Sequence, residues 1–258
     1  LPDLSYVKEV TKTIAPMLVK GNMVIIESTL PVGGTEKMIN WILEERDDLN
    51  IPTNSSKDIN DTDIHIAYCP ERVLPGNILN ELISNDRIIG GLSTECANRA
   101  QIFYKQFVQG ECIKTKIKTA EFCKLVENSF RDVNIAFANE LSLICHEEEI
   151  NVWELIRLAN RHPRVDILQP GPGVGGHCIA IDPWFIVDNN PELARIIKMA
   201  RIVNDSIPYT VISRLEEAIQ SLYKPNDEIV IATLGLTYKA NVDDTRESPG
   251  LEISREID

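Results

Sequence analysis

The apolar run Met23-Val24-Ile25-Ile26 follows Gly21 and leads directly into Glu27-Ser28-Thr29. An uninterrupted apolar run of this length is typical of a strand that is buried on both faces, as the strands of parallel sheets are. The segments 64–69 and 87–90 are predicted to be two further short strands. The sequence therefore predicts a sheet, and the segments between the strands decide its type.

Predicted helices alternate with these strands. Apolar residues recur at spacings of three and four from Leu4 to Leu18 and over 35–46, and a third helix is predicted over 93–108. This alternation predicts an α/β fold with a parallel sheet. The polar stretch 49–63 is predicted to be a solvated loop. No G-x-G-x-x-G follows any predicted strand, so the usual phosphate cradle for a dinucleotide is missing.

The pattern changes after position 118. Residues 119–149 are predicted to form one long helix with a continuous apolar stripe, and a further helix is predicted over 191–222. Residues 228–235 are predicted to be a strand. Because the chain opens on a helix and ends soon after a strand, we expect it to be truncated at both ends.

Three segments follow from this pattern. We expect 1–118 to be the remnant of a doubly wound parallel-sheet domain, 119–222 to be a central segment built on the long helix, and 223–258 to be the start of a second α/β domain.

Composition and charge limit the class of protein. The chain has 258 residues, of which 43% are hydrophobic and 25% charged, as in ordinary globular proteins. Its 39 acidic and 26 basic residues give a net charge of −13, which repels nucleic acid and anionic lipid. No apolar run approaches the roughly 20 residues needed to cross a bilayer. We therefore expect a cytoplasmic protein that binds neither nucleic acid nor membrane. The six cysteines form no CxxC pair, and we expect no metal.

The densest chemical signal is Gln-Pro-Gly-Pro-Gly-Val-Gly-Gly-His-Cys-Ile-Ala-Ile-Asp at 169–182. Its glycines permit close backbone approach to a ligand. If a helix begins near His177, Cys178 lies in the first turn, where the helix dipole favours a thiolate. Asp182 would lie on the same helical face, four residues on. The alternative is a glycine-rich loop with an incidental buried cysteine.

A second group of polar residues lies on the long helix. Lys124, Asn128 and Arg131 are spaced i, i+4 and i+7, which places them in one row. Lysine can donate a proton, asparagine can hydrogen-bond an oxyanion, and arginine can bind phosphate or carboxylate. A solvated helix face is the alternative.

Polar clusters also follow the predicted strands, where α/β sheets bind ligands. Glu71 could position a water molecule and Arg72 a phosphate. Three less specific clusters of polar or basic side chains lie in predicted loops. They are Ser28–Gly33, Arg161–Arg164, and the loop 235–249 with Lys239 and Arg246.

Four blocks of sequence, in this order, resemble the UDP-glucose/GDP-mannose dehydrogenase family. They are Cys-Pro-Glu-Arg-Val-Leu-Pro-Gly at 69–76, Cys-Lys-Leu-Val-Glu-Asn-Ser-Phe-Arg-Asp-Val-Asn at 123–134, Asn-Arg-His-Pro-Arg-Val at 160–165, and Gly-Pro-Gly-Val-Gly-Gly-His-Cys-Ile-Ala-Ile-Asp-Pro-Trp-Phe at 171–185. The resemblance covers essentially the whole chain. It is strongest to the members of the family that oxidise UDP-N-acetyl-D-mannosamine.

The resemblance implies two successive NAD-linked oxidations of the C6 alcohol of a UDP-2-acetamido sugar to the uronate. Cys178 would capture the aldehyde as a thiohemiacetal, and a second hydride transfer would leave a thioester for water to hydrolyse. Many family members have Gly-Gly-Ser-Cys where this chain has Gly-Gly-His177-Cys178, and this difference favours a 2-acetamido sugar. Segment 1–118 would be a partial NAD-binding domain, and 223–258 the start of a UDP-binding domain.

The resemblance also assigns roles to single residues. Lys124 and Asn128 would handle the proton and the oxyanion, Asp182 would assist the water or proton steps, and Glu71 would serve the attacking water. Thr29 and Arg246 would lie at the NAD. The remaining side chains would hold the UDP-sugar: Arg72, Val73, Arg131, Gly175 and Lys239, with His162 and Arg164 reaching it from the partner subunit of a homodimer or higher homo-oligomer.

Three alternatives remain open at this stage. The substrate could be UDP-N-acetylglucosamine or UDP-glucose. Cys178 could pair with His177, His162 or His146 in a hydrolase or acyltransferase. The chain could also be a non-catalytic fragment that dimerises through the long helix.

Overall fold

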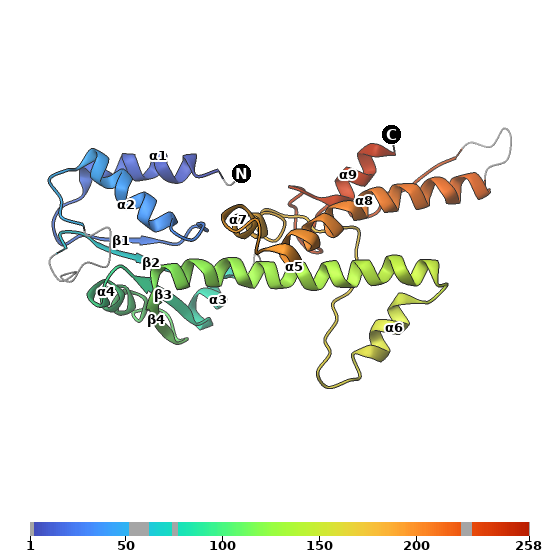
Figure 1. Ribbon diagram of the computed structural model, residues 1–258, viewed down its shortest axis with the longest axis horizontal. Coiled ribbons are helices and arrows are strands. Elements are labelled where there is room, and N and C mark those ends of the chain that lie inside the picture. The colour runs from blue at the N-terminus through green and yellow to red at the C-terminus, as the bar shows by residue number, and fades with distance from the viewer. Residues whose placement is uncertain (1–2, 52–61, 74–76, 223–228, 258) are drawn as a thin grey trace. The chain divides into compact units, whose positions relative to one another are not determined.

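The chain divides into two compact units, an N-terminal unit of residues 1–126 and a C-terminal unit of residues 127–258. Helix α5 (Ile117–Glu147) contributes residues to both. The computed structural model describes residues 3–51, 62–73, 77–222 and 229–257 (Figure 1).

A four-stranded sheet in the order β1-β2-β3-β4 forms the centre of the N-terminal unit. Its strands are β1 (Met23–Ile26), β2 (His65–Tyr68), β3 (Arg87–Gly91) and β4 (Cys112–Lys116). Pairs β1-β2 and β3-β4 are parallel, whereas β2 and β3 are antiparallel. The three predicted strands and the predominance of parallel pairing are confirmed. The antiparallel pair and β4 go beyond what the pattern predicted.

Strand β2 is buried on both faces, which explains its unbroken apolar character. Ile66 and Tyr68 belong to a core formed with α1 (Ser5–Ile14) and α2 (Gly34–Glu45). Successive side chains of a strand point to opposite faces, and accordingly Ala67 and Cys69 belong to a second core. That core is formed with α4 (Thr94–Tyr104). The short helices η1 (Ala15–Met17) and α3 (Ile78–Ser84) complete the unit.

Helices make up the regular structure of the C-terminal unit among its described residues. They are the second part of α5, followed by α6 (Val152–Ala159), α7 (Asp182–Asn189), α8 (Arg195–Leu222) and α9 (Pro249–Glu256). Helix α8 packs against both α7 and α9 (Figure 1). It contains Pro208 in its interior. Among the helices of the described residues, none combines the length and the apolar character needed to cross a membrane.

Two predictions for the C-terminal unit are wrong. The helix expected to begin near His177 begins at Asp182, because Gly173 and Gly176 adopt positive φ and the chain turns through 177–181 before it becomes helical. The strand expected over 228–235 is absent from the described residues 229–235. A strand requires a hydrogen-bonded neighbour, and the described part of this unit has no strand beside it.

Candidate active site

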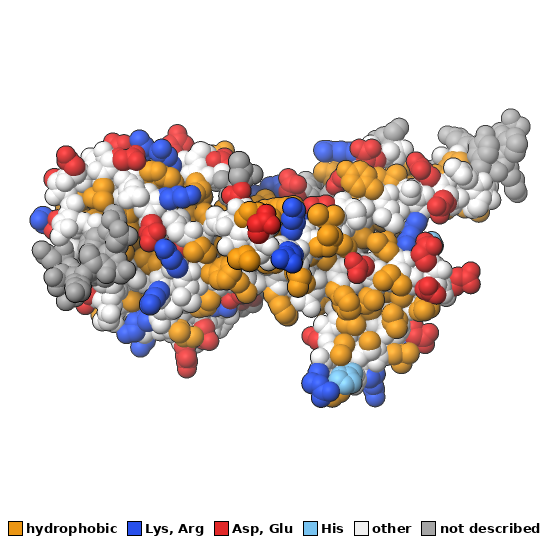
Figure 2. All heavy atoms as spheres, viewed as in Figure 1, with side chains coloured by type: hydrophobic (Ala, Val, Ile, Leu, Met, Phe, Trp, Pro, Cys, Tyr) orange, Lys and Arg blue, Asp and Glu red, His pale blue; other side chains and the backbone are white. Residues whose placement is uncertain are grey.

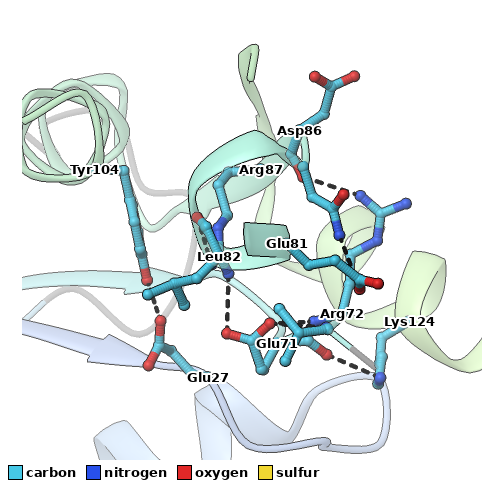
Figure 3. Close-up of polar contacts among 11 residues, drawn as sticks. Glu27, Glu71, Arg72, Glu81, Leu82, Asp86, Arg87, Tyr104 and Lys124 are labelled. Atoms are coloured by element: carbon cyan, nitrogen blue, oxygen red, sulfur yellow. Dashed lines mark hydrogen bonds and ion pairs between the residues drawn. The ribbon is translucent and has the colours of Figure 1, made fainter. Parts of the chain in front are cut away.

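Glu71 follows the carboxyl end of β2, and its carboxylate is held at both oxygens (Figure 3). Oε1 accepts hydrogen bonds from the backbone N–H groups of Arg72 at 2.6 Å and Val73 at 2.9 Å. Oε2 lies 3.1 Å from Nη1 of Arg87. Two backbone donors and a guanidinium hold the carboxylate in one orientation, so the position suits an acceptor of protons or a residue that orients water.

Arg87 is a buried cation at the start of β3. Its guanidinium stacks over the ring of Tyr104 at 5.4 Å, and the Tyr104 hydroxyl donates to Oε1 of Glu27 at 2.7 Å (Figure 3). Burial lowers the pKa of Arg87, but the hydrogen bond and charge of Glu71 outweigh it and the net pKa is raised. Burial also raises the pKa of the neighbouring Cys69 thiol to about 11, so this cysteine is a protonated core residue near neutral pH.

Lys124 lies in α5 and reaches the same strand end. Its Nζ donates to the backbone carbonyl oxygen of Glu71 at 2.8 Å (Figure 3). Two of the residues predicted for catalysis are therefore in direct contact within the N-terminal unit. The hydrogen bond places an ammonium group immediately beside the segment that carries the Glu71 carboxylate.

A second residue of α5, Glu121, holds the loop that follows β1. The Glu121 side chain is fully buried and accepts hydrogen bonds from Gly33 N at 2.7 Å, Thr35 N at 2.8 Å and Thr35 Oγ1 at 2.7 Å. It thus satisfies free N–H groups at the start of α2. Thr29, predicted to lie near the cofactor, belongs to the loop that ends at this cap.

In the C-terminal unit, Asn128 and Asp182 form a direct contact. Nδ2 of Asn128 lies 2.5 Å from Oδ2 of Asp182, which is 3% exposed. The backbone N–H of Asp182 donates to the carbonyl oxygen of Cys178 at 2.8 Å, and Ile181 N donates to the same oxygen at 3.1 Å. Asp182 is therefore tied to Cys178 through a turn of the backbone, although the two do not share a helix.

The glycines before Cys178 let the loop 236–249 approach closely. Gly176 N donates to the carbonyl oxygen of Arg246 at 3.2 Å. A Cβ atom on Gly175 would lie 2.3 Å from the Glu247 carbonyl oxygen, so no larger residue fits there. Arg246 pairs with Asp244 at 2.6 Å, and its hydrogen bond lowers the pKa of Asp244 to about 2.

Arg72 belongs to the Glu71 cluster through its backbone N–H, and its side chain donates to the Asp86 carbonyl oxygen at 3.2 Å (Figure 3). Arg131, His162, Arg164 and Lys239 are exposed. Residues 74–76 of the block around Glu71 fall outside the described residues. Across the part of the chain that is described, no three His, Cys, Asp or Glu side chains are grouped as metal ligands would be.

Sequence reasoning missed Arg87 and Glu121, which both hold predicted site elements. Arg87 begins a predicted buried strand, and a charge in that position requires a partner. Glu121 lies three residues before Lys124, but nothing in the sequence points to its backbone partners 86 or more positions away. Of the two, Arg87 alone had a signal in the sequence.

Comparison with known proteins gives a consistent result for both units. The NAD-binding domain of the UDP-glucose/GDP-mannose dehydrogenase family matches residues 1–108, and the central domain of the same family matches residues 118–206. Together the two matches include most of the chain.

Individual relatives match over nearly the whole chain. The chain is 58% identical over 260 residues to a UDP-N-acetyl-D-mannosamine dehydrogenase of Yersinia pestis, covering 99% of the chain and 61% of that protein. It is 58% identical to an NDP-N-acetyl-D-galactosaminuronic acid dehydrogenase of Ralstonia solanacearum, covering 98% of the chain and 58% of that protein. The structure of a UDP-D-ManNAc dehydrogenase from Pyrococcus horikoshii matches with a TM-score of 0.88 and 44% identity, over 99% of the chain and 59% of that protein. The chain thus spans about 60% of the length of these relatives.

Proposed function

Because the chain belongs to the UDP-glucose/GDP-mannose dehydrogenase family, we propose that the protein uses NAD to oxidise the C6 alcohol of a UDP-2-acetamido sugar to the uronate. UDP-N-acetyl-D-mannosamine is the proposed substrate, since relatives that are 58% identical carry that activity in their names. The observation that carries the proposal is the contact of Asn128 with Asp182, which the backbone joins to Cys178.

Cys178 is the proposed nucleophile. Its thiol adds to the C6 aldehyde to give a thiohemiacetal, loss of hydride from C6 converts this adduct into a thioester, and water then releases the uronate and the free thiol. NAD, when bound, supplies the hydride acceptor for both oxidations. The half-buried position of Cys178 keeps the thiol accessible to a substrate.

Lys124 and Asn128 are the proposed groups for the proton and the oxyanion. They are one turn apart in the continuous helix α5, a spacing that places both on one helical face. The 2.5 Å contact orients the Asn128 amide. Asp182 and Glu71 are proposed to accept protons or orient water, and the hydrogen bonds and ion pair that hold the Glu71 carboxylate in place suit that role.

The substrate and cofactor ligands are likewise proposals. Arg72, Val73, Arg131, Gly175 and Lys239 would hold the UDP-sugar, and cationic side chains suit its diphosphate. Thr29 and Arg246 would lie at the NAD. Two observations argue against a pyrophosphate site among the residues described: the Glu121 carboxylate occupies the N-terminus of α2, and no glycine fingerprint is present in the sequence. We accordingly propose that the 258-residue chain alone binds NAD weakly.

The decisive experiment compares Cys178→Ser with Cys123→Ser in the full-length protein. Cys123, like Cys178, is partly exposed and in no disulfide, so its substitution is a matched control. With UDP-N-acetyl-D-mannosamine, UDP-N-acetylglucosamine and UDP-glucose supplied in parallel, the first sugar should be turned over best. Cys178→Ser should lower uronate production by orders of magnitude while substrate binding survives, and Cys123→Ser should leave it unchanged. Uronate formation by Cys178→Ser at nearly the wild-type rate would rule out the covalent mechanism.

We also propose that the protein forms a homodimer through α5 and α6, with His162 and Arg164 reaching the partner's substrate. Figure 2 shows hydrophobic side chains gathered over these two helices. Large apolar residues are exposed there, with a seven-residue spacing along α5: Phe130, Phe137 and Ile144, joined by Trp153 and Leu158 of α6. Contiguous apolar surface of this kind marks an interaction site.

Sedimentation velocity tests the dimer. Phe137→Asp should shift the protein to a monomer, whereas Ile102→Asp, a substitution at an even more exposed apolar residue of α4, should not. A wild-type monomer at micromolar concentration, or a Phe137→Asp dimer, would contradict the proposal.

A further inference from the structure

The loop that carries Cys178 is attached to the helices of the C-terminal unit by the side chain of Asn139. This residue lies in α5 and is fully buried. Its Oδ1 accepts a hydrogen bond from the backbone N–H of Gly171 at 2.9 Å, and its Nδ2 donates to Oδ1 of Asn204 at 2.9 Å. A backbone N–H can only donate, so the orientation of the Asn139 amide is determined by Gly171.

Asn204 is in turn oriented by a buried ion pair. Its Nδ2 donates to Oδ1 of Asp132 at 2.8 Å and to the Asp132 carbonyl oxygen at 3.0 Å. The guanidinium of Arg201 lies 2.7 Å from the same carboxylate oxygen and also pairs with Asp205. Because Asp132 accepts from the Asn204 amide nitrogen, Oδ1 of Asn204 is left to accept from Asn139. The hydrogen bonds therefore run in one direction, from the loop through two asparagines to the Asp132 carboxylate.

Burial restricts the orientations that the Asn139 and Asn204 amides can adopt. Asp132 and Asn139 are fully buried, while Asn204 is 1% and Arg201 2% exposed. A buried polar group that loses its partner is costly. The side-chain amides of Asn139 and Asn204 are therefore each confined to one orientation.

The same loop has a second attachment, nearer to Cys178. Gly173 adopts φ +126, and a Cβ atom there would lie 3.2 Å from Pro249. The hydrogen bond from Gly176 to Arg246 follows. The segment between Gly171 and Cys178 is thus held at its start by Asn139 and near its end by the loop before α9.

We propose that Asn139 is a positioning residue, which fixes the start of this loop and thereby the place of the Cys178 thiol. The anchor stands on the geometry of the C-terminal unit alone. Its consequence for catalysis rests on the function proposed above. Loss of the anchor leaves the loop attached at one end, so that local opening should expose the thiol more often.

Thiol alkylation measures this directly. Cys178 and Cys123 are the partly exposed cysteines among the described residues, whereas the other four are buried. Rates of iodoacetamide modification at each cysteine, read by peptide mass spectrometry, compare the loop with an internal reference. In Asn139→Ala the Cys178 rate should rise about fivefold or more and the Cys123 rate should not change. The matched control is Asn134→Ala, which removes an asparagine of α5 that bonds within its own helix to the Phe130 carbonyl oxygen.

Unchanged Cys178 reactivity in folded Asn139→Ala overturns the proposal, and so does an equal rise at both cysteines, which would indicate general loosening. If Asn139→Ala does not fold, hydrogen–deuterium exchange of the wild-type protein tests the proposal instead. The Gly171 amide should exchange with deuterium as slowly as the interior of α5, and exchange as fast as the neighbouring loop amides would refute the anchor. In the full-length enzyme kcat should fall more than KM changes. If alkylation responds as expected but wild type forms no uronate, the proposed function fails and the anchor stands.

Discussion

Nη1 of Arg87 lies 3.1 Å from Oε2 of Glu71, and the two side chains differ greatly in their exposure to water. The Arg87 side chain is 2% exposed and the Glu71 side chain is 35% exposed. A guanidinium withdrawn from water depends on its partner more than a carboxylate that still reaches solvent. The pair therefore fixes the position of Glu71 while leaving its carboxylate open to water.

Substitution Arg87→Lys should destabilise the N-terminal unit. Lysine keeps the charge but loses the planar group that stacks on Tyr104 and binds Glu71, so the free energy of unfolding should fall by about 1–3 kcal/mol. Arg99→Lys is the control, since Arg99 forms an exposed ion pair with Glu95 at 2.7 Å. This substitution should change the free energy of unfolding by less than about 0.5 kcal/mol. Urea titration followed by circular dichroism measures both. Equal effects would show that the burial of Arg87 has no energetic consequence.

Glu121→Gln should loosen the loop between β1 and α2. The amide retains one oxygen for the three donors on Gly33 and Thr35 and turns its own NH2 group toward another donor. An unsatisfied buried donor costs about 1–3 kcal/mol, and thermal unfolding should reflect that loss. Glu36→Gln removes an exposed pair with Lys118 and should change the midpoint little. A Glu121→Gln protein as stable as wild type would mean that the carboxylate is dispensable as a cap.

Asn128→Asp should make stability depend on pH in a new way. A second carboxylate would face the buried Asp182, and the repulsion raises the pKa of one of the two groups. A folded-state pKa above the unfolded value means that stability recovers as the pH falls. The melting temperature should therefore be lowered strongly at pH 7.5 and less at pH 5. Asn134→Asp, on the same helix, should show no such recovery, and a uniform loss at both pH values for Asn128→Asp would contradict the contact.

His65 should make the N-terminal unit sensitive to mild acid. It is 7% exposed, and burial, assisted by the charge of Arg99, lowers its pKa. The unfolded chain then binds the proton more readily, so the contribution of neutral His65 is complete above about pH 6.5 and is lost as the pH falls below it. Urea titrations at pH 7.5 and 5.5 should show a smaller loss for His65→Gln than for wild type. Identical pH dependence in the two proteins would exclude His65 as the cause.

Much of the N-terminal fold could be predicted, because a strand that is buried on both faces has apolar residues at successive positions. The apolar runs of β1, β2 and β3 require cover on both sides. Strand β4 was missed because it is largely solvent-exposed: Ile113 is 46% exposed, and Lys114 is also exposed. The antiparallel pairing of β2 with β3 depends on the path of the connection between them, which periodicity does not encode.

Some residues of the candidate site could likewise be predicted from the sequence, and others could not. Spacing alone drew attention to Lys124, Asn128 and Asp182, and the structure places the last two in contact. Asn139 and Glu121 gave no such signal. Their partners are backbone N–H groups 32 and 86 or more positions away in the sequence. A long-range bond from a side chain to the backbone leaves no spacing pattern to detect.

The proline inside α8 leaves one backbone carbonyl oxygen of that helix without its helical hydrogen bond. Pro208 has no N–H, so the carbonyl oxygen of Asn204, four residues earlier, receives no helical hydrogen bond from it. The loop passes that oxygen at Gly173, where an added Cβ would lie 3.4 Å away. A break in the helical ladder therefore coincides with the place where the cysteine loop crosses α8. Pro208→Ala would restore the donor, and with it the helix would compete with its surroundings for this carbonyl.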